Sequence, residues 1–124
     1  MTHVILLVDR EIHVRHIISY KLRREGFITH SVSSPDEAKR VLDQNRIDLV
    51  LMDIALPTPI EGFKLAQHIR QRDDSTLDLP LIILSAQCSE TDIRRSNEIT
   101  ASGYITKPFS LKFVIRKIKA ILHA

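Results

Sequence analysis

Short apolar runs alternate with amphipathic segments along the chain. Runs of strand length lie at 3–8, 28–32, 48–52, 81–84 and 103–106. Segments with helical spacing or helix-start signals follow these runs, over 11–24, from 35 onwards, over 62–72, from 89 onwards and from 110 onwards. The pattern therefore predicts five strands, each followed by a helix.

Capping residues mark several of the predicted helix ends. Gly26 follows the first helix, as a C-terminal glycine would. Ser34 precedes the second helix, with Pro35 in its first turn and Glu37 in position to complete a capping box. The segment from 89 has few large apolar residues, so its helix is expected to be surface-lying or mobile.

The expected core takes apolar residues from four of the helices and from the second strand. These residues recur at helical or strand spacing. They are Ile12, Ile17, Ile18, Leu22, Ile28, Val32, Ala38, Val41, Leu42, Phe63, Leu65, Ala66, Ile69, Leu111, Val114, Ile115, Ile118 and Leu122. Phe113 falls off the main stripe of the last helix, and two readings remain open: an exposed surface residue, or one tucked against Phe109.

Five strand–helix repeats with right-handed crossovers predict a parallel sheet covered by helices on both faces. The runs at 3–8, 48–52 and 81–84 are almost continuously apolar, which is typical of central strands buried on both sides. We therefore predict an α/β fold, a doubly wound five-stranded parallel sheet of flavodoxin-like (βα)5 type with strand order 2-1-3-4-5. Residues 1–124 are expected to form one domain.

Composition narrows the classes of function. Hydrophobic residues make up 44% and charged residues 27% of the chain, as in ordinary globular proteins. The formal charge of +3 is small and dispersed, and aromatic residues are only 5%, so direct binding to nucleic acid is not expected. The chain has no membrane-length apolar run and no signal-peptide pattern, and its single cysteine, Cys88, suits a reducing compartment. We therefore expect a cytoplasmic domain without membrane contact.

Polar side chains stand at the carboxyl ends of four predicted strands. These residues are Asp9, Asp53, Ser85 and Lys107. In the predicted order the first and third strands meet where the order reverses, so Asp9 and Asp53 should share one crevice. Carboxylates can hold Mg²⁺ or attack a phosphoryl group, and a lysine and a hydroxyl can bind phosphoryl oxygens. The chain carries no Gly-rich phosphate loop and no nucleophile elbow.

With these residues in place, the chain resembles the receiver domain of bacterial two-component response regulators. The match runs in order through almost the whole chain. Its pieces are Ile5-Leu6-Leu7-Val8-Asp9, Asp48-Leu49-Val50-Leu51-Met52-Asp53, Leu56-Pro57 with Gly62, Leu84-Ser85-Ala86 and Gly103-Tyr104-Ile105-Thr106-Lys107-Pro108-Phe109.

The resemblance implies roles for individual residues. Asp53 would accept a phosphoryl group from a sensor histidine kinase or phosphotransfer protein. Asp9, Asp53 and the backbone carbonyl of Ala55 would hold Mg²⁺, and Ser85 and Lys107 would bind the phosphoryl oxygens. At most, the chemistry would be autocatalytic phosphotransfer to Asp53 and hydrolysis from it.

The resemblance also implies a switch. Tyr104 would move inward when Ser85 engages the phosphoryl group. That movement would change the surface built from the helix after 89, the strand at 103–106 and the helix after 110. This surface would serve an output protein or domain, and it also suits a homodimer. Pro108 matches a family position that often follows a cis peptide bond.

One position departs from the family pattern. The family usually has a second acid after Asp9 that binds the metal directly, and this chain has Arg10. Asp9 and Asp53 against Lys107 and Arg10 give a neutral pocket, so Mg²⁺ binding is expected to be weak or absent. Three arrangements remain open: Arg10 pairs with one of the aspartates, Arg10 turns to solvent while Glu11 supplies a metal oxygen, or Arg10 simply begins the helix.

Two functions are therefore in view. One is a receiver switched by phosphorylation of Asp53, and the alternative is a phosphorylation-independent pseudo-receiver in which Arg10 replaces the metal charge. The resemblance implies that the helix over 11–24 is a surface for kinase partners. His13 and His16 on this helix could share a metal, but solvent-facing or partner-facing positions are favoured. The segment 58–61 is one residue longer than the family's usual spacing, and Pro59 is expected to stiffen a loop there. A stand-alone regulator and a domain of a longer protein both remain open.

Overall fold

The computed structural model describes residues 2–55, 58–71, 79–86, 94 and 101–124. Its elements are β1 (Val4–Val8), α1 (Ile12–Arg24), β2 (Ile28–Val32), α2 (Pro35–Gln44), β3 (Leu49–Asp53), α3 (Pro59–Arg70), β4 (Leu81–Ser85), β5 (Gly103–Thr106) and α5 (Leu111–Leu122). Cys88 and nearly all of the helix expected from 89 lie outside the described residues. Within the described ranges, no helix combines the length and the apolar character needed to span a bilayer.

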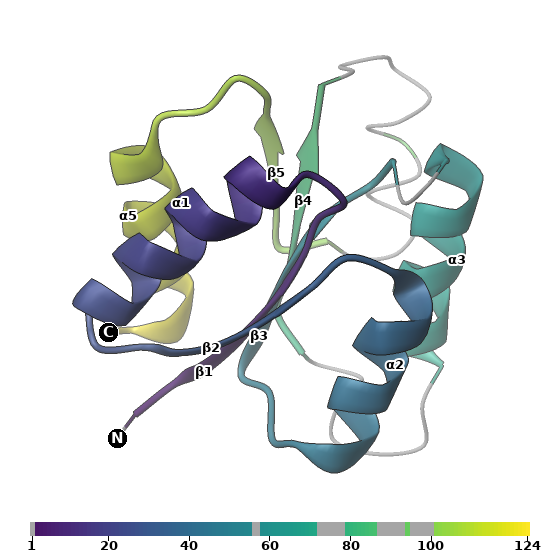
Figure 1. Ribbon diagram of the computed structural model, residues 1–124, viewed down its shortest axis with the longest axis horizontal. Helices are drawn as coiled ribbons and strands as arrows, with labels where there is room; N and C mark the ends of the chain where they lie inside the picture. Colours follow the sequence, from purple (N-terminus) through teal and green to yellow (C-terminus); the bar gives the residue numbers. More distant parts are fainter. Residues whose placement is uncertain (1, 56–57, 72–78, 87–93, 95–100) are drawn as a thin grey trace.

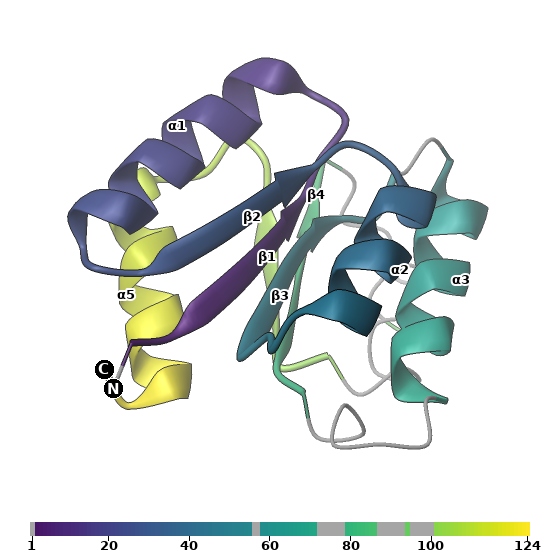
Figure 2. The same ribbon diagram turned by 60° about the horizontal axis from the view of Figure 1, so that its bottom comes forward.

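The strands form one parallel sheet in the order β2-β1-β3-β4-β5. Helices α1 and α5 cover one face of this sheet, and α2 and α3 cover the other (Figures 1 and 2). The predicted doubly wound α/β fold and its strand order are confirmed. The reversal of strand order lies between β1 and β3, where ligands bind in open α/β sheets.

Side chains alternate between two cores, because successive strand residues point to opposite faces of the sheet. Leu6, Val50 and Ile83 pack with the inner sides of α2 and α3, where Ala38, Leu42, Leu65, Ala66 and Ile69 are buried. Ile5, Leu51 and Leu84 pack instead under α1 and α5 with Ile18, Leu22, Val114, Ile115 and Ile118. The predicted inner faces of α2, α3 and α5 are confirmed.

Three apolar residues expected in the core are half exposed. Ile12 and Ile17 of α1 are 50% and 53% exposed, and Ile28 of β2 is 50% exposed. The prediction was wrong because α1 buries only the narrow stripe that contains Ile18 and Leu22. Ile28 begins β2, which is an edge strand of the sheet and is therefore less completely covered than a central strand.

Local capping signals set the helix ends. The Ser34 hydroxyl accepts a hydrogen bond from the Glu37 backbone N–H at 3.3 Å, as predicted. The Glu37 carboxylate, however, accepts from the hydroxyls of Ser33 and Ser34. Gly26 follows α1 with a φ of 92°, a left-handed conformation that favours glycine.

Helix α3 begins three residues earlier than predicted. Thr58 is its N-cap and accepts a hydrogen bond from the Glu61 N–H at 3.4 Å, and Pro59 is the first helical residue. Proline suits that position because the first N–H of a helix has no intrahelical partner. Pro59 therefore starts a helix instead of stiffening a loop.

Gly62 lets α3 approach the end of the third strand. A Cβ atom at Gly62 would lie 1.7 Å from the backbone oxygen of Ile54, the residue that follows Asp53. Only glycine permits so close an approach of two backbones. The start of α3 is thus packed directly against the segment that carries Asp53.

Candidate functional site

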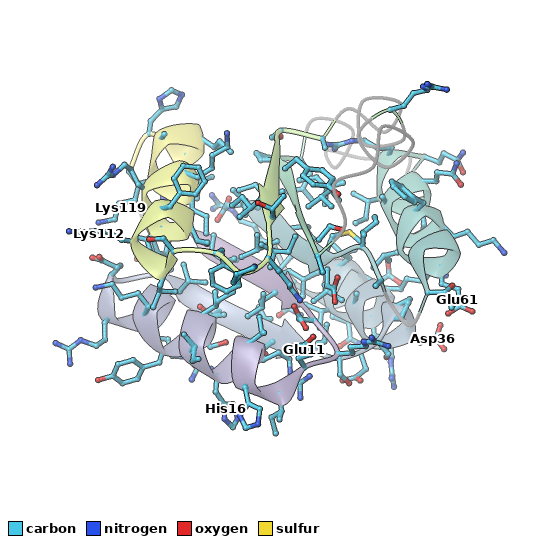
Figure 3. The ribbon with its side chains drawn as sticks, turned by 90° about the horizontal axis from the view of Figure 1, so that it is seen from above. Glu11, His16, Asp36, Glu61, Lys112 and Lys119 are labelled. Atoms are coloured by element: carbon cyan, nitrogen blue, oxygen red, sulfur yellow. The ribbon has the colours of Figure 1, made fainter. Side chains whose placement is uncertain are left out.

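The polar residues predicted at the strand ends meet at the carboxyl edge of the sheet. Strands β3 and β4 each run one residue further than predicted, so Asp53 pairs with Leu84 and Ser85 pairs with Thr106. A cavity of about 170 Å³ opens at this edge, lined by Arg10, Glu11, Asp53, Ile54, Ala55, Ser85, Ala86 and Lys107. Figure 3 shows Glu11 at this edge, between the two layers of helices.

Asp9 is fully buried at the end of β1. Its Oδ1 accepts a hydrogen bond from the Glu11 backbone N–H at 2.8 Å, and its Oδ2 accepts one from Lys107 Nζ at 2.9 Å. Arg15 Nη1 donates to the Asp9 backbone oxygen at 2.7 Å. The carboxylate is therefore held at both oxygens, and α1 is fastened to the strand end through Arg15.

Arg15 is a site residue that the sequence reasoning missed. A signal for it exists in the sequence, since Arg15 comes one helical turn after Glu11, where a long side chain can reach back to the strand end. Its guanidinium donates to a backbone carbonyl, and no sequence pattern ties arginine to that acceptor.

Asp53 is the last residue of β3 and is only 4% exposed. Its Oδ1 accepts a hydrogen bond from the Ala55 backbone N–H at 3.1 Å, and its Oδ2 lies 3.4 Å from Lys107 Nζ. The Ile54 N–H bonds to the backbone oxygen of Leu84 at 3.0 Å, which keeps the chain in the sheet just past Asp53. The Asp53 carboxylate therefore lines the cavity from a backbone that is hydrogen-bonded on both sides of this residue.

Lys107 brings the two aspartates together. It follows β5, and its backbone N–H donates to the Ser85 carbonyl at 2.7 Å. The peptide bond from Lys107 to Pro108 is cis, as the resemblance predicts. With Nζ close to one oxygen of Asp9 and one of Asp53, a single ammonium faces both carboxylates.

Burial and charge shift the pKa values of two groups here. Burial raises the pKa of Asp9 above its ordinary value of 3.8, against the lowering effect of the hydrogen bonds from Glu11 and Lys107. Burial alone would lower the pKa of Lys107, but Asp9, Asp53 and Glu11 together raise it above 10.5. Lys107 is therefore a cation at neutral pH.

Arg10 and Glu11 sit at the rim of the cavity. Both are exposed, and both line it. The Glu11 Oε1 lies 4.0 Å from Lys107 Nζ, so Glu11 adds a third carboxylate that a count of Asp9 and Asp53 alone leaves out. The backbone N–H of Glu11 makes a shorter contact, its hydrogen bond of 2.8 Å to Asp9 Oδ1.

Ser85 and Tyr104, the two residues of the predicted switch, are both in place near the edge. Ser85 ends β4, is 2% exposed and lines the cavity. Tyr104 lies on β5 and packs, half-buried, against the core under α2 and α3. Phe113 on α5 is 49% exposed, which agrees with the first of the two readings of this residue.

The response regulator receiver domain model matches residues 5–119. The chain belongs to this family. It is 35% identical over 118 residues to the phosphate regulon transcriptional regulatory protein PhoB of Pseudomonas aeruginosa, covering 95% of this chain and 51% of that protein. Over 122 residues it is 34% identical to the transcriptional regulatory protein SrrA of Staphylococcus aureus, covering 98% of this chain and 48% of that protein. This receiver thus spans about half the length of these curated relatives.

Solved structures agree with the assignment of the fold. A putative response regulator from Chloroflexus aurantiacus superimposes with a TM-score of 0.89 at 29% identity, covering 100% of both chains. The receiver fold and its strand order are therefore shared with known receivers.

Receiver domains typically bind Mg²⁺ at their acidic site, through oxygen ligands. In the described ranges, no group of three or more His, Cys, Asp or Glu side chains is placed to hold a metal ion. The Oδ2 atoms of Asp9 and Asp53 both face Lys107, and Arg10 stands where the family's second acid is expected. One oxygen of each aspartate therefore already lies against an ammonium.

Proposed function

We propose that the chain is a signalling receiver whose Asp53 accepts a phosphoryl group from a histidine kinase or phosphotransfer protein in the cytoplasm. The observation that carries this proposal is the position of the Asp53 Oδ2 atom. It lies 3.4 Å from Lys107 Nζ, at a cavity that Ser85 also lines. A nucleophilic carboxylate, a cation and a hydroxyl are the groups that phosphoryl transfer to an aspartate needs.

The step requires no other covalent chemistry from the protein. An oxygen of Asp53 forms a bond to phosphorus while the P–N bond of a phosphohistidine breaks, and the departing imidazole takes up a proton. Lys107 pairs with one phosphoryl oxygen, and the Ser85 hydroxyl donates to another. Hydrolysis from Asp53 returns the carboxylate.

We infer that positive side chains take over much of the charge compensation that Mg²⁺ supplies in related domains. Lys107 already faces both aspartates, and Arg10 lines the same cavity. With Glu11 counted, the site has three carboxylates against two cations, so it attracts a divalent cation less than the family's usual three carboxylates against one lysine. The metal is expected to assist transfer only at high concentration.

Phosphorylation would then act on the surface around β5 and α5. The Lys107 backbone N–H donates to the Ser85 carbonyl at 2.7 Å, and Tyr104 lies on β5, three residues before Lys107. Engagement of Ser85 by a phosphoryl oxygen would draw Tyr104 inward and alter the face that exposes Phe113. An output protein or domain, or a second copy of the chain, would read this face.

The second candidate is a pseudo-receiver that works without phosphorylation. It is favoured by Arg10, which lines the cavity with Asp53 at the position where the family usually has a metal-binding acid. A cation fixed at this position would replace the charge that a metal supplies. Such a module would interact with its partner in one fixed conformation.

Treatment with acetyl phosphate separates the two candidates. The chain is incubated with and without Mg²⁺, and intact mass spectrometry measures the adduct. A receiver gains the mass of one phosphoryl group, and the D53N variant, which keeps the shape of the side chain, does not. A wild-type chain that stays unmodified at every Mg²⁺ concentration would refute the proposal and leave the pseudo-receiver.

A further inference from the structure

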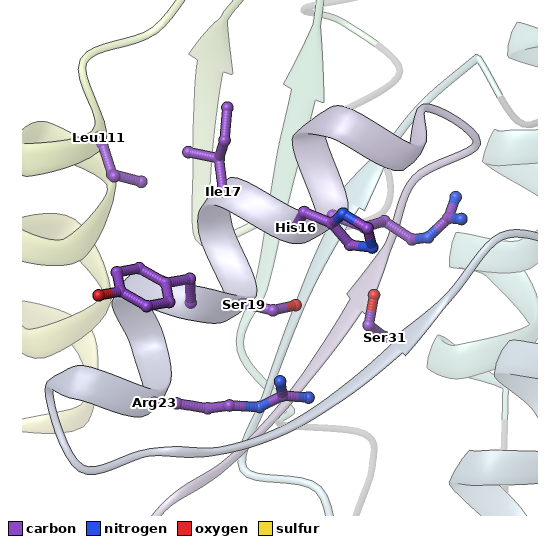
Figure 4. Close-up of a pocket in the computed structure, with 8 residues that line it drawn as sticks. His16, Ile17, Ser19, Arg23, Ser31 and Leu111 are labelled. Atoms are coloured by element: carbon purple, nitrogen blue, oxygen red, sulfur yellow. The ribbon is translucent and has the colours of Figure 1, made fainter.

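A large groove lies between α1 and the edge strand β2, away from the aspartate site. It belongs to a cavity of about 800 Å³, which continues over α1 toward α5. Arg15, His16, Ser19 and Arg23 line it from α1, and Ser31 lines it from β2 (Figure 4). We call these five residues and the space between them the α1–β2 groove.

The hydroxyls of Ser19 on α1 and Ser31 on β2 line this groove, and Thr29 lies close by on β2. The register pairs Thr29 with Ile5 and Ser31 with Leu7, so both β2 residues lie on the face that α1 covers. Ser19 of α1 is 5% exposed, and neither its hydroxyl nor that of Thr29 has a hydrogen-bond partner in the described part of the chain. Buried hydroxyls normally find a partner, which points to an additional ligand at this seam.

The charge of the groove favours an anion. Helix α1 contains four arginine or lysine residues, two histidines and no acid. Arg15 is held by the Asp9 carbonyl, but no hydrogen bond or ion pair to another described residue engages the Arg23 guanidinium. His16 is exposed beside them. Figure 4 places Ser19 and Ser31 across the gap from each other, with Arg23 and His16 on either side.

The shape of the groove suits an extended chain better than a small ion. Among the described strands, β2 pairs with β1 alone, so one side of β2 has no neighbouring strand there. Extended peptides bind beside such edges through backbone hydrogen bonds.

We propose that the α1–β2 groove binds an acidic peptide segment of a partner protein. The carboxylates of the segment pair with Arg23 and with His16 when protonated, and the hydroxyls of Ser19 and Ser31 donate to its oxygens. This site is separate from the Asp53 cavity, and its lining shares no residue with it. Binding therefore does not require phosphorylation.

The test is an NMR titration of the ¹⁵N-labelled chain. The probes are a glutamate-rich peptide, a peptide of the same length with glutamine at each glutamate, inorganic phosphate and a single-stranded oligonucleotide. The glutamate peptide is expected to shift the amide signals of Ser19, Arg23 and Ser31, and the glutamine peptide is not.

Two neighbouring arginines provide matched variants. R23Q removes a charge inside the groove and is expected to weaken binding of the glutamate peptide by about tenfold, the effect of a lost charge-assisted hydrogen bond. R24Q removes the same charge from the adjacent residue, which donates to the Tyr20 hydroxyl and does not line the cavity. R24Q should therefore change the affinity for the glutamate peptide little. S19A is expected to weaken binding while the fold, checked by its own amide spectrum, stays intact.

Four results would overturn the proposal. Equal losses in R23Q and R24Q would mean that only net charge matters. Shifts away from α1 and β2 would place the peptide elsewhere. If inorganic phosphate shifts the same signals and binds as tightly as the glutamate peptide, the groove is a small-anion site. If the oligonucleotide binds more tightly than the glutamate peptide, the groove is a nucleic-acid surface.

Discussion

Replacement of Gly62 by alanine tests whether the close approach of α3 to the Asp53 segment matters for stability. The new Cβ would lie 1.7, 2.5 and 2.9 Å from the oxygen, carbonyl carbon and Cα of Ile54. Real Cβ atoms essentially never come closer than 3.0 Å, so helix and carbonyl would have to separate by about 1.3 Å, the difference between 3.0 and 1.7 Å. All three atoms belong to the backbone, and no side chain can rotate away.

Two opposing effects decide the sign. Alanine is favoured over glycine in a helix interior by about 1 kcal/mol. Overpacking costs about 1 to 3 kcal/mol, and displacement of backbone puts Gly62 at the upper end of that range. The expected net loss is about 2 kcal/mol in the free energy of unfolding, or a melting point lower by about 8 °C for a domain of this size.

Urea unfolding followed by circular dichroism measures the loss in G62A, and an amide spectrum measures the shift at Asp53 and Ala55. G103A is the matched control, because its Cβ would meet the flexible side chain of Lys117 at 2.6 Å instead of backbone. It should lose much less stability than G62A. A G62A variant as stable as the wild type would refute the reasoning.

Three further predictions concern the charges of the site and a helix cap. Burial raises the pKa of Asp9 in the folded state. The stability that protonated Asp9 contributes is therefore fully present below about pH 3.8 and is lost as the pH rises through the folded-state pKa. Urea unfolding should find D9N more stable than the wild type at pH 7, and this difference should vanish toward pH 3.8. K107M leaves Asp9 and Asp53 facing each other without their shared cation and should cost about 3 kcal/mol at pH 7 in the same assay. S34A removes the acceptor of the Glu37 N–H and should cost about 1 kcal/mol, measured by thermal unfolding.

The last two of these predictions have an internal control. K107M combined with D9N should recover part of the loss, because only one carboxylate then remains beside the missing ammonium. If the double variant is less stable than K107M alone, repulsion between the aspartates is not the cause. S33A removes a hydroxyl that donates an exposed hydrogen bond to the Glu37 carboxylate and does not cap the helix, so a loss as large as that of S34A would contradict the capping argument.

Several features of the site and the core could not be predicted from the sequence. The bond from Arg15 to the Asp9 carbonyl depends on how α1 leaves the strand end. The contact between Gly62 and Ile54 depends on where α3 begins, and the prediction placed that start at Gly62 itself because it took Pro59 for a loop residue. Ile28 was expected in the core because its spacing fits a strand, but spacing does not report that a strand lies at the edge.

The sequence by itself determined the alternation of strands and helices and the end of each strand at which a polar group stands. Periodicity and capping chemistry are local, and they place Asp9, Asp53, Ser85 and Lys107 at one edge of a parallel sheet once its order is known. Tertiary structure alone decided that one ammonium faces both aspartates, since the reach of Lys107 depends on the register of β5 against β4. It also decided that Ser19 and Ser31 face each other with Arg23 beside them, because that seam joins a helix face to a sheet edge.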